Sequence, residues 1–331
     1  MRNSFALVKK LNSNSDELIF NNFRLTKISR GDTGALKEAQ RLFSKAWVFY
    51  GDWIYKREYD NSADWDEIPS DVEDTLLLLR LYKTGDLFFV QPCIEEADGN
   101  LSSQLPYPVM VSTTTTLRYE INIEECSSFD AFALEIVSQE NWSSSWFKIA
   151  RRFFLYGGGK EHNPAHDQLD RIVDYITALE ATLVPESDFV GRRLRERAVK
   201  LINGIELETQ KVLLRDFYGV RSTIVHGSKI GPKQRDALKN IADFETIVRN
   251  VLVSALSTIP SNDDDRNNFL KQLFPICDQT KAEQVFNEFC KIKDEYEKEN
   301  CFKKISKRIP YANQRCGITK LFQRIAKNRA R

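Results

Sequence analysis

The sequence predicts an α+β region in residues 1–145, followed by an all-helical bundle in residues 146–260. Two observations favour this division. Before residue 145, β-rich segments alternate with segments of helical spacing. After residue 146, apolar residues recur at helical intervals with few interruptions. Residues 261–331 are predicted to form a helical extension with a basic end. A length of 331 residues suits two domains, or one domain with extensions.

The composition indicates a globular protein that stays in the cytoplasm. Hydrophobic residues make up 42% of the chain and the net charge is +1. No apolar run approaches the roughly 20 residues that span a bilayer, and the first residues lack the pattern of a secretion signal. The six cysteines form no C-x-x-C pair, so we expect neither structural zinc nor a disulfide framework. We therefore predict no membrane contact, no metal and no cofactor.

Charge is unevenly distributed along the chain. Residues 52–74 are rich in acids, whereas the segment from Lys303 to the end carries ten Lys or Arg residues and no acid. A segment of this kind attracts polyanions, and an equally good interpretation is a solvated helix with a basic face. The candidates for contact with an RNA backbone in this segment are Lys303, Lys304, Lys307 and Arg308.

The elements of the first region can be predicted from local patterns. The apolar run 75–82 follows an acidic lead and predicts a helix with Ser70 as its N-cap. A turn is expected at 83–86, and a strand at 87–92 that Pro92 ends. The alternating segment 115–123 is β-rich. Helical spacing returns at 128–139.

The bundle is predicted from five helical segments, at 146–157, 166–184, 188–202, 206–227 and 231–259. Gly227 stands where a left-handed C-terminal cap is expected, and Pro232 where a helix can begin. The glycine-rich segment 157–160 is interpreted as a flexible turn. His162 and His166 follow it in an expected exposed loop, because Pro164 separates them. Residues 260–268 are predicted to be a polar linker.

The stretch "YGVRSTIVHG" (218–227) places an arginine and a histidine near a helix end. Arginine binds phosphate through two parallel hydrogen bonds, and histidine exchanges protons near neutral pH. Five helical steps turn the chain about 500°, so Arg221 and His226 point about 140° apart. A shared site therefore needs a bend at the helix end, or a second copy across a two-fold axis. The simpler alternative is a helix-end histidine bonded to a carbonyl, with Arg221 on the surface.

These residues resemble the HEPN superfamily, in particular its Apea-like group, over about residues 150–260. The resemblance depends on two motifs, Y-x-x-R-S-x-x-x-H-G and an earlier helix with D-x7-A-L-E. In this chain they are Tyr218, Arg221, Ser222, His226 and Gly227, and Asp170, Ala178, Leu179 and Glu180. Ser222 departs from the wider superfamily, which often has Asn, Asp or His after the arginine. A hydroxyl can still donate to a phosphate, but it is a weaker sign of catalysis.

The resemblance implies that residues 146–260 form a HEPN helical bundle that dimerises through its motif helices. Many members are metal-independent endoribonucleases of toxin–antitoxin, phage-defence or CRISPR-associated systems. By this resemblance, Arg221 and His226 from both copies would cut RNA by attack of the 2′-hydroxyl, with Ser222 assisting. The expected partners are RNA such as tRNA or mRNA, and an antitoxin or a phage-derived trigger sensed by residues 1–145. Other members are catalytically inactive binding modules, which is the alternative function.

Four further side chains have two interpretations each. Tyr218 is a candidate for stacking on a base or, alternatively, for packing in an interface. Glu180 lies in the apolar stripe of its helix and needs a partner; it either holds Arg221 or another arginine in place, or forms a simple structural salt bridge. Arg192 and Arg193 are candidates for RNA-backbone contact, or part of a solvated helical face.

Overall fold

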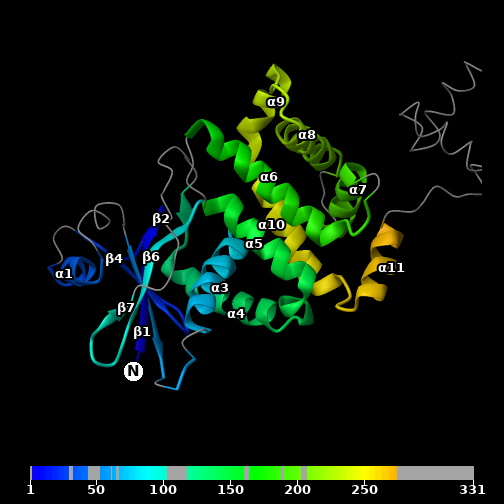
Figure 1. The fold of residues 1–331 in the computed structure, drawn as a ribbon. Helices are drawn as coiled ribbons and strands as arrows, with labels where there is room; N and C mark the ends of the chain where they lie inside the picture. Colours follow the sequence, from blue (N-terminus) through cyan, green and yellow to red (C-terminus); the bar gives the residue numbers. More distant parts are fainter. Residues whose placement is uncertain are drawn as a thin grey trace, which may run out of the picture. The chain divides into compact units, whose positions relative to one another are not determined.

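The computed structural model describes residues 2–29, 33–43, 53–60, 62–64, 67–102, 118–159, 164–187, 190–202 and 207–273 (Figure 1). Within these ranges the chain is mostly helical, with β-structure in its N-terminal part. Residues Met1–Leu270 form one compact unit, and the boundary predicted near residue 145 falls inside it. In the described ranges, no helix combines the length and apolar character needed to cross a membrane. The basic segment from Lys303 onward lies outside the described residues.

The N-terminal part contains a six-stranded antiparallel sheet in the order β3–β4–β5–β1–β6–β7. Its strands are β1 (Arg2–Lys9), β3 (Glu17–Ile19), β4 (Arg24–Lys27), β5 (Trp53–Tyr59), β6 (Phe88–Glu95) and β7 (Leu101–Ser102). A separate parallel pair joins β2 (Leu11–Asn12) to β8 (Tyr119–Glu120). The last six residues of β1 are all buried, because β1 is central and both faces of the sheet are covered.

Helices cover the two faces of the sheet with different cores. Phe5 and Leu7 of β1 pack with residues of α1 (Thr33–Leu42). The alternate residues Ala6 and Val8 join a larger cluster on the other face, as expected for the two-residue period of a strand. That cluster includes residues of α3 (Glu67–Tyr82) and α4 (Cys126–Val137), which follows the short 3₁₀ helix η1 (Ile123–Glu125).

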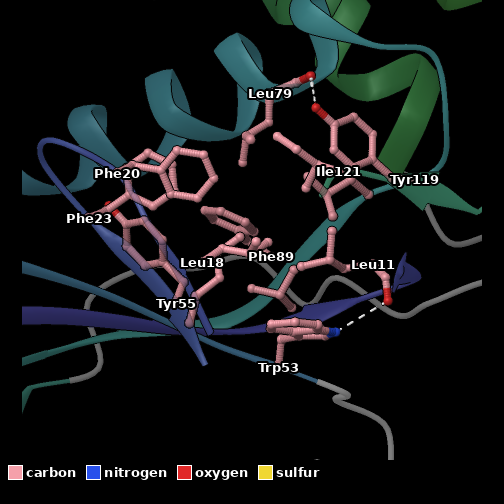
Figure 2. Close-up of a cluster of buried hydrophobic side chains, with 14 of the residues drawn as sticks. Leu11, Leu18, Phe20, Phe23, Trp53, Tyr55, Leu79, Phe89, Tyr119 and Ile121 are labelled. Atoms are coloured by element: carbon pink, nitrogen blue, oxygen red, sulfur yellow. Dashed lines mark hydrogen bonds between the residues drawn. The ribbon is translucent and has the colours of Figure 1, made fainter. Parts of the chain in front are cut away.

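The larger cluster is rich in aromatic side chains, and two of them, Trp53 and Tyr119, donate to backbone carbonyls (Figure 2). The Trp53 indole donates to the Leu11 carbonyl at 3.2 Å, and the Tyr119 hydroxyl donates to the Leu79 carbonyl at 2.6 Å. A buried indole or phenol without such a partner would cost free energy. These two bonds therefore tie β5 to the segment after β1, and β8 to the end of α3.

The remaining described chain is a helical assembly around α6 (Figure 1). Its other members are η2 (Glu140–Ser143), α5 (Ser145–Gly159), α7 (Val190–Ile202), α8 (Leu207–Val225), α9 (Pro232–Ala237), η3 (Leu238–Asn240), α10 (Ile241–Thr258) and α11 (Asp263–Leu273), with α6 spanning Pro164–Leu183. α6 packs against α5, α7, α8 and α10. α3 contacts both β6 and α10, so it joins the sheet to the helices.

Several predicted elements of the first region have different bounds in the structure. α3 begins at Glu67 and not near Ser70, which lies inside the helix. Pro92 does not end its strand but lies within β6, where the pairing with β1 shifts register between Phe5 and Leu7. A proline is tolerated at such an irregularity because it has no N–H to donate. Within the predicted β-rich segment 115–123, residues 119–120 form strand β8. Residues 115–117 belong to the range 103–117, which lies outside the described residues.

In the helical part, the structure differs from the prediction at several glycine, proline and polar residues. Gly157–Gly159 are the last residues of α5 and not a flexible turn. Pro164 is the first residue of α6, a position that suits proline. The predicted helix 231–259 is divided by η3 into α9 and α10. Much of the predicted linker 260–268 belongs to α11, which buries Arg266.

The glycines that end α5 are required by their neighbours. A Cβ on Gly157 would lie 2.6 Å from the Tyr175 ring, and one on Gly158 would lie 1.9 Å from the Arg80 guanidinium. Arg80 is almost fully buried and donates to the carbonyls of Phe154 and Leu155 at 3.2 and 3.0 Å. The absence of a side chain therefore lets a buried cation reach the end of α5.

We expect Gly158→Ala to lower the free energy of unfolding by about 1–3 kcal/mol, because the new methyl group displaces a buried guanidinium from its carbonyls. The matched control is Gly219→Ala in α8, where an added Cβ meets nothing within 4 Å. That variant should gain about 0.5–1 kcal/mol from helix propensity. Urea unfolding measures both, and equal effects of the two substitutions would contradict the packing argument.

Candidate functional site

The C-terminus of α8 is closed by a glycine cap. Gly227 has a φ of +64°, a conformation that glycine adopts without a Cβ penalty. Its N–H donates to the Ile224 carbonyl at 2.9 Å, and the Ser228 N–H donates to the Thr223 carbonyl at 2.9 Å. These two bonds form a Schellman motif. The predicted left-handed cap at Gly227 is therefore confirmed.

His226 lies at the last turn of α8, immediately before the cap. Its backbone N–H closes the helix on the Ser222 carbonyl at 3.1 Å. The imidazole is exposed and makes no hydrogen bond or ion pair with any described residue. The carbonyl bond of the simpler alternative is thus not present among the described residues, and the exposed ring is accessible to a ligand.

Arg221 is held by an ion pair with Glu180 of α6. Its Nη2 donates to Glu180 Oε2 at 3.1 Å. The arginine side chain is 24% exposed and the glutamate side chain 20% exposed. A guanidinium carries five N–H donors, and this pair uses one of them. Arg221 is therefore oriented by the protein, its side chain is partly exposed, and its Nε is buried without a hydrogen-bond partner from the described residues.

Tyr218 completes a cluster at the junction of α6, α7 and α8. The Arg221 guanidinium lies 6.0 Å from the centre of the Tyr218 ring, within the range of a cation–π contact. The ring covers Gly191 of α7, where a Cβ would lie 2.4 Å from it. Burial, with the negative charge of Glu180, raises the pKa of Tyr218. The contacts favour packing as the role of Tyr218 in this conformation.

Burial also raises the pKa of Glu180 above its usual value of 4.5, although the positive charge of Arg221 acts in the opposite direction. The loss of hydration at the carboxylate therefore outweighs the attraction of its partner. Arg221 is therefore positioned by a carboxylate whose ionised form is destabilised by burial.

Ser222 and His226 belong to an outer stripe of α8. Residues that recur three or four positions apart share one side of a helix, and this stripe comprises Val212, Arg215, Gly219, Ser222 and His226. The side chain of Val212 is 44% exposed and that of the adjoining Val225 is 53% exposed. Gln234 of α9 braces the end of the helix by donating to the Thr223 hydroxyl at 2.5 Å.

The predicted RNA-backbone arginines of α7 are largely engaged inside the protein. The Arg193 side chain is 13% exposed and pairs with Glu186 at 2.5 Å. Arg192 is partly buried and has an interaction partner of its own. Neither side chain belongs to a freely solvated helical face. The ion pair of Arg193 leaves little of its side chain exposed for the predicted contact with an RNA backbone. Lys303, Lys304, Lys307 and Arg308 lie outside the described residues.

Sequence reasoning missed a buried ionic cluster near the start of α6. Arg171 Nη2 donates to Asp86 Oδ1 at 2.9 Å and to Glu245 Oε2 at 2.8 Å. Arg80 donates to the Tyr175 hydroxyl at 2.8 Å and lies 3.6 Å from Glu245. The partners are far apart in sequence, and no spacing rule relates them. The one signal of this cluster in the sequence is Arg171, a charged residue next to the apolar stripe of its predicted helix.

Among the described residues, no group of three or more His, Cys, Asp or Glu side chains is arranged to hold a metal ion. Comparison of the chain with protein-family models, with curated proteins and with solved structures gives no match. The interpretation of the site therefore depends on the arrangement of Arg221, Glu180, Tyr218 and His226.

We expect Glu180→Gln to change the pH dependence of stability. A carboxyl with a raised pKa binds its proton more tightly in the folded state, so its contribution to the free energy of unfolding falls as pH rises from 4.5 through the raised pKa. Glutamine does not titrate, so the stability of wild type relative to the variant should fall as the pH rises above 4.5. Urea unfolding at several pH values measures this difference.

The control is Glu208→Gln on α8, where the side chain is 86% exposed and paired with Lys211. Exposed pairs contribute little, so this variant should follow the wild type. A wild-type advantage over Glu180→Gln that stays constant or grows with pH would contradict the prediction.

Proposed function

We propose that the chain is a HEPN-type endoribonuclease that cleaves RNA without a metal cofactor, acting as a toxin or an anti-phage defence effector. The observation that carries the proposal is the end of α8. There, a partly exposed Arg221 is oriented by Glu180, and an exposed, unengaged His226 follows at the capped helix end. These are the groups that phosphodiester cleavage needs at one surface: a fixed cation and a proton-transfer group.

The proposed reaction uses the ribose of the substrate as its nucleophile. An imidazole accepts the proton of the 2′-hydroxyl, and the 2′-oxygen attacks the adjacent phosphorus. The bond from phosphorus to the 5′-oxygen breaks, and a second proton donor protonates that oxygen. The products are a 2′,3′-cyclic phosphate and a 5′-hydroxyl. DNA has no 2′-hydroxyl and is not a substrate.

Two copies of the chain would supply the complete site. Arg221 and His226 diverge along one helix, so a second α8 related by a two-fold axis brings complementary groups to the same phosphate. The outer stripe of α8, with Val212 and Ser222, is the proposed contact between copies. Ser222 would donate to a phosphate oxygen, and the basic segment from Lys303 would help to retain RNA by its charge.

The test is cleavage of a tRNA or total-RNA pool in EDTA by the wild type and by His226→Ala. Removing a general acid or base lowers a rate by about 10²–10⁴-fold, so the variant should leave the RNA essentially intact. A cyclic phosphate at the new 3′ end would identify the 2′-hydroxyl as the nucleophile.

The matched control is Ser228→Ala, an exposed neighbour whose backbone N–H, and not its side chain, makes the cap. It should cleave like the wild type. Equal cleavage by the wild type and His226→Ala would remove the proposal.

The second candidate is a catalytically inactive HEPN-type binding module, and one observation favours it. Glu180 already occupies one donor of Arg221 within the same chain, and its negative charge opposes the approach of phosphate. This candidate predicts that expression of the wild type slows growth no more than expression of Arg221→Ala. The nuclease proposal predicts slower growth with the wild type alone. Growth curves after induction, at matched protein levels, separate the two.

A further inference from the structure

The outer side of α4 carries apolar residues that no described element covers. The side chain of Leu134 is 76% exposed and that of Val137 45% exposed, and Ala131 is exposed on the same side. These three residues lie at intervals of three, within an arc of about 120°. Ile123, just before the helix, is 50% exposed. We call Ile123, Ala131, Leu134 and Val137 the α4 stripe.

The chain segment that carries the α4 stripe is acidic. Between Arg118 and Lys148 the chain has six acidic residues and no Lys, Arg or His. They are Glu120, Glu124, Glu125, Asp130, Glu135 and Glu140. In the described part of the chain, Glu125 pairs with Lys83, and the others have no ion pair. Asn12, Asn14, the Asn21 N–H and Ser261 donate to four of them, and the Glu135 carboxylate accepts from no described residue.

We propose that the α4 stripe binds a basic amphipathic helix of a partner protein. Apolar side chains at helical spacing on the partner would bury Leu134 and Val137, as in other helix-on-helix recognition. Lysine or arginine residues beside them would meet Glu135 and its neighbours, which gives both orientation and faster association. The exposed apolar residues of α4 and the Glu135 carboxylate, which pairs with no described residue, lie on the same helix. A partner helix with one apolar face and basic residues beside it would match both.

The charge of the surface argues against three other occupants. Nucleic acids and anionic membranes carry phosphates that these carboxylates repel. A second copy of the same stripe would bring the acids together, because a two-fold contact pairs a surface with itself. The inference does not depend on the nuclease proposal, since α4 lies outside the segment 146–260 and shares no residue with the end of α8.

The test uses the full-length protein and a fluorescein-labelled 18-residue peptide of leucine and lysine, with leucines at i, i+3, i+4 and i+7. Fluorescence anisotropy should show binding that weakens as NaCl is raised, since exposed charges are screened. The double variant Leu134→Ser/Val137→Ser should bind at least about tenfold more weakly, which corresponds to the loss of two apolar contacts. Glu135→Lys should weaken binding in the same direction.

The controls are Leu101→Ser and Glu208→Lys, which change an exposed leucine of β7 and an exposed glutamate of α8. Both should bind like the wild type. A peptide with glutamate in place of lysine should not bind. No binding of the basic peptide by the wild type would overturn the proposal, and so would equal binding by the wild type and the Leu134→Ser/Val137→Ser variant.

Discussion

The ion pairs of Arg171 constrain much of the molecule. Burying a charge is costly unless it is paired and hydrogen-bonded, and Arg171 meets Asp86 and Glu245 at hydrogen-bonding distance. Asp86 lies beside the start of β6, and Glu245 belongs to α10. One guanidinium on α6 therefore fixes two other segments. Removing either carboxylate would leave Arg171 with one buried partner in place of two, and breaking a buried ion pair typically costs about 3–5 kcal/mol.

Buried arginines also satisfy the carbonyls at the ends of helices. The last carbonyls of a helix have no partner within it, and a cation suits that end of the helix dipole. Arg266 donates to the carbonyls of Ala181 and Thr182, and Arg197 donates to that of Leu183. The half-buried Arg249 does the same at Leu81 and Tyr82 of α3. The C-terminal ends of α6 and α3 are thus held by side chains that reach them from elsewhere in the chain.

Hydrophobic periodicity predicted the major helices, because a helix that is buried on one side has apolar residues at regular intervals. The helices at 128–139 and 166–184 and the cap at Gly227 follow from such local signals. Strand β1 was not predicted, since both of its faces are buried and its alternation disappears. The glycines of α5 were misread because the cause of their absent side chains, Arg80 and Tyr175, is distant in sequence. In the candidate site, residue types could be chosen from spacing, but the pair of Glu180 with Arg221 remained one of two alternatives.

Two charged residues of α6 are engaged, Arg171 with Asp86 just before β6 and Glu180 with Arg221 of the candidate site. Arg171 and Glu180 are nine residues apart, which corresponds to about 13 Å along a rigid helix axis. Because one helix carries both residues, the distance between the Arg171–Asp86 pair and the Glu180–Arg221 pair is fixed by the geometry of α6.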